Sequence, residues 1–357
     1  MNIIKRGLIV LLISLLAIWG VAFIKVNYVG HAYAPVSDGQ LAEAKAYLSS
    51  QMTPTPDDFQ WSMIETAPGV SLRTGLLEHP NPKGTVIVVP GFTGAIEMIM
   101  REISMIHAAG YRVASIEYRG QGMSYRPLKN HPEKGYVEDY NTLGSELALF
   151  AKKVKQKRSP LFFFSISKGA HITMRMAAEQ AVDVTAFALI VPMIKINSGE
   201  FPYENLRTIS SMMTKVGLGA AYSPGGSAWP GDEMVFGEAT DCNANPDSAQ
   251  AQSALFAINE KLRTKSVTYK WLYETTNSTE KLLSSEFIAQ IKQPVKIYTA
   301  GIDSLVSTDA AEKFCDSLAQ CEAVHYPSSR HCITRENYEL YDGIINDAIS
   351  HFDHHAE

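Results

Sequence analysis

The chain has 357 residues, of which 46% are hydrophobic and 19% charged, and it carries a formal net charge of −5. This composition is typical of a globular protein with a sizeable core, in one large domain or two ordinary ones. The negative charge argues against the basic surface of a nucleic-acid-binding protein, so we expect no nucleic-acid partner. No Cys/His spacing is typical of a zinc site, and we predict neither a metal nor any other cofactor.

An apolar stretch near the N-terminus departs from this globular pattern. Residues 8–24 contain no charged side chain and are interrupted only by Ser14 and Gly20. Their number is near the lower end of the roughly 17–25 residues that span a bilayer. Lys5 and Arg6 precede the stretch, which predicts a cytoplasmic start and an extracytoplasmic body, on the periplasmic side if the source is bacterial.

A cleaved signal peptide is the alternative interpretation, because Ala32-Tyr33-Ala34 resembles a cleavage site. Against it, the apolar stretch is long for a signal peptide, and the site lies well beyond its end and is followed by Pro35. We therefore expect residues 1–35 to be a retained membrane anchor. The pattern of residues 37–52 predicts an amphipathic helix, and we assign residues 36–58 as a spacer.

Residues 59–192 form the first part of the predicted core. Two short alternating strands come first, and from residue 85 to residue 192 apolar strands and helices alternate strictly. This order predicts an α/β fold with a mostly parallel, doubly wound sheet, whose functional groups lie at the carboxyl ends of its strands. We expect strands at 59–65, 70–77, 85–89, 112–117, 161–165 and 186–192, and helices at 97–109, at 139–154 and from residue 168 onward.

The junction after strand 161–165 carries the pattern Ser165-Ile-Ser167-Lys168-Gly169. It is close to the Gly-x-Ser-x-Gly of a nucleophile elbow, a sharp strand-to-helix turn that exposes the central side chain and requires small residues two positions away on each side. Ser165 and Gly169 meet this requirement, so Ser167 is the candidate nucleophile, and the helix N-terminus behind it favours developing negative charge. A plain strand–turn–helix with a chance serine is the alternative. We expect His171, just past the elbow, to be a helix-packing residue.

The alternation stops at Met193 and resumes with a strand at 295–299. We interpret residues 193–292 as a helical lid inserted over the sheet, because Asn, Gly, Pro and Ser clusters surround helical pieces at 206–216, 246–264 and 268–274. Residues 293–357 form the second part of the core, with a helix at 308–318, a last strand at 323–326 and a closing helix at 338–352. Four apolar lid residues are candidates for the lining of an acyl site, although for any single one the favoured alternative is that it packs the lid onto the core. They are Met212, Met213, Val216 and Leu218.

Two residues after the lid complete a candidate catalytic triad. A serine nucleophile needs a base, and the base needs a carboxylate that fixes its tautomer and stabilises the imidazolium. On this topology the order along the chain is serine, acid, histidine, and Asp303 and His331 follow the last two strands. We therefore predict Ser167, Asp303 and His331 as the triad. The backbone N–H groups of Phe92, in a glycine-containing loop after strand 85–89, and of Lys168 are the expected oxyanion hole.

The chain contains four cysteines. Cys315 and Cys321 lie where a helix should give way to a strand, and in an oxidising compartment they are candidates for a small disulfide. Cys242 and Cys332 are far apart in sequence, and the sequence alone does not pair them. Four buried free thiols are the alternative.

Five motifs resemble the α/β-hydrolases of the monoacylglycerol lipase and lysophospholipase group, often labelled the serine aminopeptidase family. The resemblance covers residues 60–355 and implies an α/β-hydrolase fold and serine hydrolase chemistry, while it says little about the substrate. The chain differs from the usual family pattern at Pro90, Glu117 and Ser165, where the family has His, Asp and Gly; the change at Pro90 leaves the backbone donors in place. The motifs are Val-Pro-Gly-Phe-Thr-Gly at 89–94, Tyr-Arg-Gly-Gln-Gly-Met-Ser at 118–124, Ser-Ile-Ser-Lys-Gly at 165–169, Gly-Ile-Asp-Ser-Leu-Val at 301–306 and Arg-His-Cys-Ile-Thr-Arg-Glu at 330–336.

These patterns support one leading hypothesis and two alternatives. The leading one is a membrane-anchored serine hydrolase that cleaves carboxylic esters of lipids, either monoacylglycerols or lysophospholipids, through an acyl-enzyme on Ser167. The second is an exported serine aminopeptidase, which needs a carboxylate in the lid to bind the ammonium group of its substrate. The third is a binding protein on an α/β-hydrolase scaffold, which the complete triad disfavours. The candidate lid carboxylates are Glu200, Glu204, Asp232, Glu233 and Asp241.

Overall fold

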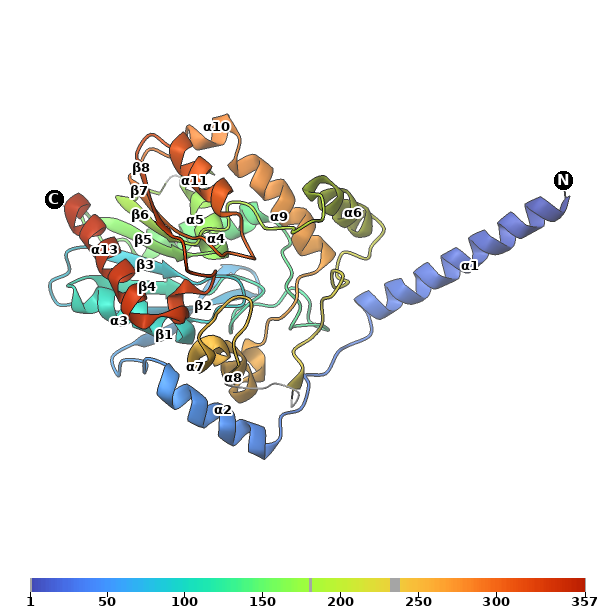
Figure 1. Cartoon of the computed structure of the whole chain (residues 1–357), viewed down its shortest axis with the longest axis horizontal. Helices are drawn as coiled ribbons and strands as arrows, with labels where there is room; N and C mark the ends of the chain where they lie inside the picture. Colours follow the sequence, from blue (N-terminus) through green and yellow to red (C-terminus); the bar gives the residue numbers. More distant parts are fainter. Residues whose placement is uncertain (1, 180–181, 232–237, 357) are drawn as a thin grey trace.

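An eight-stranded sheet lies at the centre of the computed structural model, which describes residues 2–179, 182–231 and 238–356. Its strands are β1 (Gln60–Ala67), β2 (Val70–Leu77), β3 (Thr85–Val89), β4 (Arg112–Ile116), β5 (Leu161–Ile166), β6 (Ala186–Ile190), β7 (Val295–Ala300) and β8 (Cys321–Tyr326). The strand order is β1-β2-β4-β3-β5-β6-β7-β8 (Figure 1). Pairs that involve β2 are antiparallel and all others are parallel, which confirms the predicted α/β-hydrolase architecture.

Helices cover both faces of the sheet, because alternate residues of each buried strand point to opposite sides. Ile87 and Phe163 pack into one hydrophobic cluster with residues of α4, α5 and α11, whereas Val88 and Phe164 pack into a second cluster with residues of α3 and α13. The carboxyl ends of the strands, after which the candidate site residues come, therefore lie between two layers of packed helices. These helices are α3 (Met100–Ala108), preceded by the 3₁₀ turn η1 (Ile96–Ile99), α4 (Tyr140–Val154), α5 (Lys168–Glu179), α11 (Thr308–Ser317) and α13 (Tyr338–Ala356), preceded by α12 (Ile333–Glu336).

Two helices precede the sheet, α1 (Asn2–Asn27) and α2 (Asp38–Gln51). Within the described residues, α1 contains the one stretch long and apolar enough to cross a membrane, Gly7–Asn27, and it projects away from the body (Figure 1). α2 is the predicted spacer helix. Its Ala44 and Leu48 are buried in a third hydrophobic cluster, so α2 is packed onto the body rather than extended as a free linker.

The C-terminal part of α1 and the chain that follows it are bound to the body. Trp19 Nε1 donates a hydrogen bond of 3.0 Å to the carbonyl oxygen of Val216, and the last residue of α1, Asn27, donates one of 2.9 Å to the carbonyl oxygen of Gly217. The guanidinium of Arg263 donates to the carbonyl oxygen of Ala34 at 2.8 Å. The stretch that resembles a signal-peptide cleavage site is therefore held by the folded domain.

Residues 193–292 lie between β6 and β7 and are mostly helical and irregular. The predicted helical piece at 246–264 is broken into three short elements, and the piece at 268–274 is the start of a longer helix that packs against α6. Trp229 and α8 pack against α2 in the third cluster, which joins the insertion to the N-terminal segment. The elements are α6 (Tyr203–Lys215), α7 (Pro246–Ala249), α8 (Ala251–Ile258), η3 (Glu260–Leu262), α9 (Tyr269–Leu282) and α10 (Ser285–Ile288).

All four cysteines are paired. The predicted disulfide between Cys315 and Cys321 joins the end of α11 to the start of β8. The second disulfide, Cys242–Cys332, crosses 90 positions in the sequence and links the insertion to the loop after β8. Disulfides of this kind persist in oxidising compartments.

A buried carboxyl group makes the stability of this fold depend on pH. Glu102 on α3 is 2% exposed and accepts a hydrogen bond of 2.7 Å from Tyr341 Oη on α13. Burial raises its pKa from 4.5 to about 7, although the charges of Arg335 and Arg101 act in the opposite direction. Since the pKa in the folded state is the higher one, the folded state binds the proton more tightly. The stability that the protonated Glu102 contributes to the folded state is complete below about pH 4.5 and is lost as the pH rises through 7.

We therefore expect Glu102→Gln to raise the free energy of unfolding by about 3 kcal/mol at pH 8, because the amide is neutral at every pH. At pH 5 the gain should fall below about 1 kcal/mol, because the wild-type carboxyl group is then largely protonated in the folded state. Urea unfolding at the two pH values measures the difference. An equal gain at both values would contradict a buried, proton-binding Glu102.

Candidate active site

Ser167 alone makes the turn between the end of β5 and the start of α5. Its backbone has a φ of +49°, in the left-handed region that side-chain-bearing residues rarely occupy and that nucleophile elbows require. A Cβ at Gly169 would lie 2.5 Å from the carbonyl oxygen of Pro90, so no larger residue fits there. Ser165 is fully buried, and its hydroxyl is 2.8 Å from Thr173 Oγ1. The sequence requirement for small flanking residues is thus explained by the packing.

The structure brings the three predicted triad residues together. His331 Nε2 lies 2.9 Å from Ser167 Oγ, and His331 Nδ1 lies 2.6 Å from Asp303 Oδ2. Asp303 has a side chain that is 1% exposed, and its other oxygen accepts the backbone N–H groups of Leu305 and Val306 at 2.8 and 2.9 Å. The carboxylate is therefore held rigidly behind the imidazole, on the side away from the serine. This geometry can remove the proton of Ser167 and hold the resulting imidazolium.

The loop that contains Phe92 packs directly against the elbow. A Cβ at Gly91 would lie 3.3 Å from the Cβ of Ser167. The carbonyl oxygen of Gly91 accepts hydrogen bonds of 2.9 Å from Tyr118 Oη and from Gln121 Nε2. These bonds anchor the carbonyl side of the loop in the body. The predicted oxyanion donors, the N–H groups of Phe92 and Lys168, therefore belong to two segments that meet at Ser167.

The side chain of Lys168, next to Ser167, is buried. Its Nζ lies 4.6 Å from the ring centre of Tyr118 and 5.5 Å from that of Phe92. Burial lowers the pKa of the Lys168 ammonium group to about 7. Aromatic faces attract a cation, so the two rings offset part of this desolvation.

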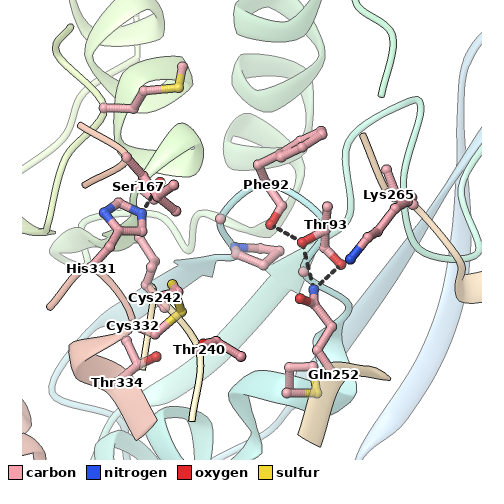
Figure 2. A pocket seen from close by; sticks show the side chains of 18 of the residues that line it. Phe92, Thr93, Ser167, Thr240, Cys242, Gln252, Lys265, His331, Cys332 and Thr334 are labelled. Atoms are coloured by element: carbon pink, nitrogen blue, oxygen red, sulfur yellow. Dashed lines mark hydrogen bonds between the residues drawn. A yellow bond between two sulfur atoms is a disulfide. The ribbon is translucent and has the colours of Figure 1, made fainter. Parts of the chain in front are cut away.

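A side chain of the insertion is also hydrogen-bonded to the loop that contains Phe92, which we call the oxyanion loop because it carries a predicted oxyanion donor. Thr93, directly after Phe92, has a φ of +61°. Gln252 on α8 donates hydrogen bonds to the carbonyl oxygen and to Oγ1 of Thr93, at 2.7 and 2.6 Å (Figure 2). Gln252 carries no sequence signal for this role, because no local pattern indicates a contact between α8 and a loop 159 positions earlier.

Ser167 and His331 line a cavity of about 610 Å³, a size typical of small-molecule sites. Figure 2 shows these two side chains facing each other on one side of the cavity and Thr93 and Gln252 on another. Among the described residues, no Asp or Glu lines the cavity, whereas Lys265 and Arg335 do. Much of the remaining wall is apolar and includes Ile166, Met193, Ile196, Trp229, Phe256 and Trp271.

Two sets of candidate residues in the insertion lie away from the cavity wall where the structure describes them. Met212, Met213, Val216 and Leu218 do not line the cavity. α6 packs on α9, which leaves Met212 56% exposed and brings Val216 next to α1. The candidate carboxylates Glu200, Glu204 and Asp241 also lie outside the cavity wall, and Asp232 and Glu233 are not among the described residues.

His171 is a structural histidine, as expected. Its Nδ1 lies 2.8 Å from the carbonyl oxygen of Met193, and its Nε2 lies 2.6 Å from Ser278 Oγ. Burial lowers the pKa of this imidazole to about 3, so it stays neutral and ties α5 to α9. In the part of the chain that the structure describes, no group of three His, Cys, Asp or Glu side chains is arranged to bind a metal.

Comparisons with known proteins show the family and the fold of this chain. The family model described as "Serine aminopeptidase, S33" matches residues 80–338. Similar solved structures include a soluble variant of the monoglyceride lipase from Saccharomyces cerevisiae in complex with a substrate analogue, with 17% sequence identity and a TM-score of 0.65 over 85% of this chain and 96% of that one. A thermostable carboxyl esterase from Bacillus coagulans has 18% identity and a TM-score of 0.65 over 85% and 100% of the two chains. The monoacylglycerol lipase from Paleococcus ferrophilus has 15% identity and a TM-score of 0.60 over 78% and 99%. No curated protein sequence matches the chain.

Gln252→Ala should lower kcat for an ester substrate about tenfold, because Thr93 then loses the donors that hold the oxyanion loop. The loss is smaller than the roughly 100-fold or greater effect of deleting an oxyanion donor itself. Gln252→Glu should lose as much activity, since a carboxylate cannot donate to the Thr93 carbonyl oxygen. Steady-state kinetics on p-nitrophenyl esters measures both variants, and wild-type kcat in the folded Ala variant would contradict the role of Gln252.

Proposed function

We propose that this chain, which belongs to the serine aminopeptidase S33 family of hydrolases, is a serine hydrolase that cleaves carboxylic esters of lipids, with monoacylglycerols or lysophospholipids as substrates. The observation that carries the proposal is the hydrogen-bonded series from Asp303 through His331 to Ser167, which opens onto a largely apolar cavity. The monoglyceride lipase and carboxyl esterase folds found among similar structures support the same class of reaction.

In the proposed mechanism, Ser167 Oγ attacks the acyl carbonyl carbon while His331 Nε2 accepts the hydroxyl proton. Asp303 keeps the imidazole in the correct tautomer and stabilises its positive charge. The negative charge on the former carbonyl oxygen is stabilised by the N–H groups of Phe92 and Lys168. His331 then gives the proton to the leaving alcohol, which departs and leaves an acyl-enzyme. A water molecule, activated by the same imidazole, releases the fatty acid and restores Ser167.

The cavity wall supports an ester substrate over a peptide. An aminopeptidase has to bind a free ammonium group, for which a carboxylate is the natural partner. The described lining residues provide no carboxylate but two cations, Lys265 and Arg335. An apolar pocket with cationic side chains suits an acyl chain with a polar or anionic head group better than a peptide N-terminus. The aminopeptidase remains the second candidate, and turnover of monoolein compared with that of aminoacyl-naphthylamides separates the two.

We further propose that α1 is a retained membrane anchor and that the body is extracytoplasmic. Three features support this arrangement: the apolar length of Gly7–Asn27, the binding of the following segment to Arg263, and the two disulfides. The exposed apolar residues Met212 and Val216 lie on or next to α6, whose C-terminal end contacts α1, and they add apolar surface near the end of the span.

The nucleophile is tested by two alanine variants at the elbow. Ser167→Ala should lower kcat on p-nitrophenyl acyl esters by about 10⁴-fold or more and abolish labelling by a fluorophosphonate probe, because it removes the hydroxyl that lies 2.9 Å from His331 Nε2. Ser165→Ala is the matched control, because it deletes a hydroxyl two positions away that bonds only to Thr173 in the interior. It should keep wild-type turnover at a cost of about 1–2 kcal/mol in stability.

Near-normal turnover by the Ser167→Ala variant would refute the proposed mechanism. Absence of fluorophosphonate labelling in the wild-type protein would instead favour a binding protein on the same scaffold.

The anchor is tested by the N-terminal sequence of the mature protein. We expect protein from the membrane fraction to begin at Met1, and a variant lacking residues 1–27 to remain soluble and to hydrolyse esters, because it keeps the bond between Arg263 and Ala34. A mature protein that begins at Pro35 and is recovered in the soluble fraction would show cleavage by a signal peptidase and contradict the anchor.

A further inference from the structure

The residue directly after His331 is covalently bound to the insertion. Cys332 pairs with Cys242, with a distance of 5.2 Å between their Cα atoms. Both cysteines line the cavity that contains Ser167, and Figure 2 shows the disulfide beside the imidazole. The bond therefore joins the loop after β8, which carries His331, to the wall of the cavity.

The loop after β8 that carries His331, the imidazole loop, is attached to the sheet side at two points. The N–H of Ile302 donates to the carbonyl oxygen of Ser329 at 2.9 Å, and Ile333 is buried in the second hydrophobic cluster. β8 itself is the last strand of the sheet and is paired with β7 alone. Asp303 and Ser167 contact only the ring of His331, so they do not fix the backbone that follows it. The backbone that follows His331 is hydrogen-bonded to the insertion, because the N–H of Cys332 donates to the carbonyl oxygen of Cys242 at 2.9 Å.

The surrounding contacts with the insertion include the hydrogen bond that Ser248 Oγ on α7 donates to the carbonyl oxygen of Arg335, and hydrogen bonds to an irregular stretch. Residues 238–245 contain neither helix nor strand. Arg330 Nη1 donates to the carbonyl oxygen of Thr240 at 2.7 Å, and the N–H of Ala244 donates to Glu336 Oε1 at 3.2 Å. Water can replace such bonds when a cavity opens, because it offers equivalent donors and acceptors. It cannot replace a covalent bond, so the disulfide is the contact that keeps the two segments together.

We propose that the Cys242–Cys332 disulfide positions His331 on Ser167, so that the protein reaches full activity only after this bond has formed. This inference rests on the proposed ester hydrolysis. It adds a positioning role for two cysteines and makes catalysis dependent on an oxidising compartment. The second disulfide, Cys315–Cys321, spans six positions at the start of β8, lies outside the cavity wall and has no such role.

Reduction of the Cys242–Cys332 disulfide should lower the rate of ester hydrolysis although every reacting group stays in the protein. A displacement of about 1 Å at a reacting centre costs on the order of 100-fold in rate, so we expect kcat to fall by about 10- to 100-fold. KM should change much less, because most of the apolar wall does not depend on the disulfide. Labelling of Ser167 by a fluorophosphonate should slow in parallel with kcat. A disulfide with a purely stabilising role would leave both rates unchanged in protein that is still folded.

Two double variants of the full-length chain in detergent provide the test, each assayed before and after treatment with dithiothreitol. The reagent donates two electrons and two protons, the S–S bond becomes two thiols, and dithiothreitol becomes its cyclic disulfide. Cys315→Ser/Cys321→Ser should have wild-type kcat, lose it on reduction and regain it when oxidised glutathione takes the two electrons back. Cys242→Ser/Cys332→Ser should have the lower kcat from the outset and be insensitive to the reagent.

The inference is overturned if folded Cys242→Ser/Cys332→Ser protein keeps wild-type kcat and labelling rate. If this variant does not fold, Cys242→Ala/Cys332→Val, which restores apolar volume, carries the same test together with the reduced Cys315→Ser/Cys321→Ser protein. Absence of hydrolysis and of labelling in untreated wild-type protein would overturn the proposed function itself, and with it the positioning role.

Discussion

The close approach of two strand ends governs the rest of this structure. The turn after β5 touches the loop after β3 so tightly that Gly169 faces the backbone carbonyl oxygens of Val89 and Pro90. This contact requires a glycine and places Ser167 in a left-handed backbone conformation. Because the two segments meet there, the serine hydroxyl and the N–H of Phe92 belong to the same small region.

The cavity around this point is assembled from three parts of the chain. The sheet supplies the elbow and the loops after β7 and β8, the insertion supplies most of the opposite wall, and α2 supports the insertion from outside. Two links tie the insertion to residues next to the candidate site residues Phe92 and His331, one from Gln252 to Thr93 and one from Cys242 to Cys332. The wall of the cavity and the geometry of the candidate site are therefore mechanically coupled.

Sequence patterns predicted the core well and the insertion poorly. Strands such as β3 and β5 are continuous apolar runs that only a sheet covered on both faces can bury, so their order specifies the architecture. Residues 193–292 lack such runs. In α6, the pattern identifies Met212 and Val216 as one apolar face, but it does not say which surface that face meets. It was a candidate for the cavity wall, with packing onto the core as the favoured alternative, and the structure places it toward α1 and solvent.

By itself, the sequence determined the parallel sheet, the elbow at Ser167 and the order of Asp303 and His331 after it, because these depend on local periodicity and on the short reach of a strand-to-helix turn. Only the tertiary structure decided that Cys242 pairs with Cys332 and that Gln252 donates hydrogen bonds to Thr93. It also decided which side chains line the cavity, where the described residues include no Asp or Glu. These contacts join residues tens to hundreds of positions apart. Their distances depend on how the irregular insertion folds back over the sheet, and no local pattern encodes that path.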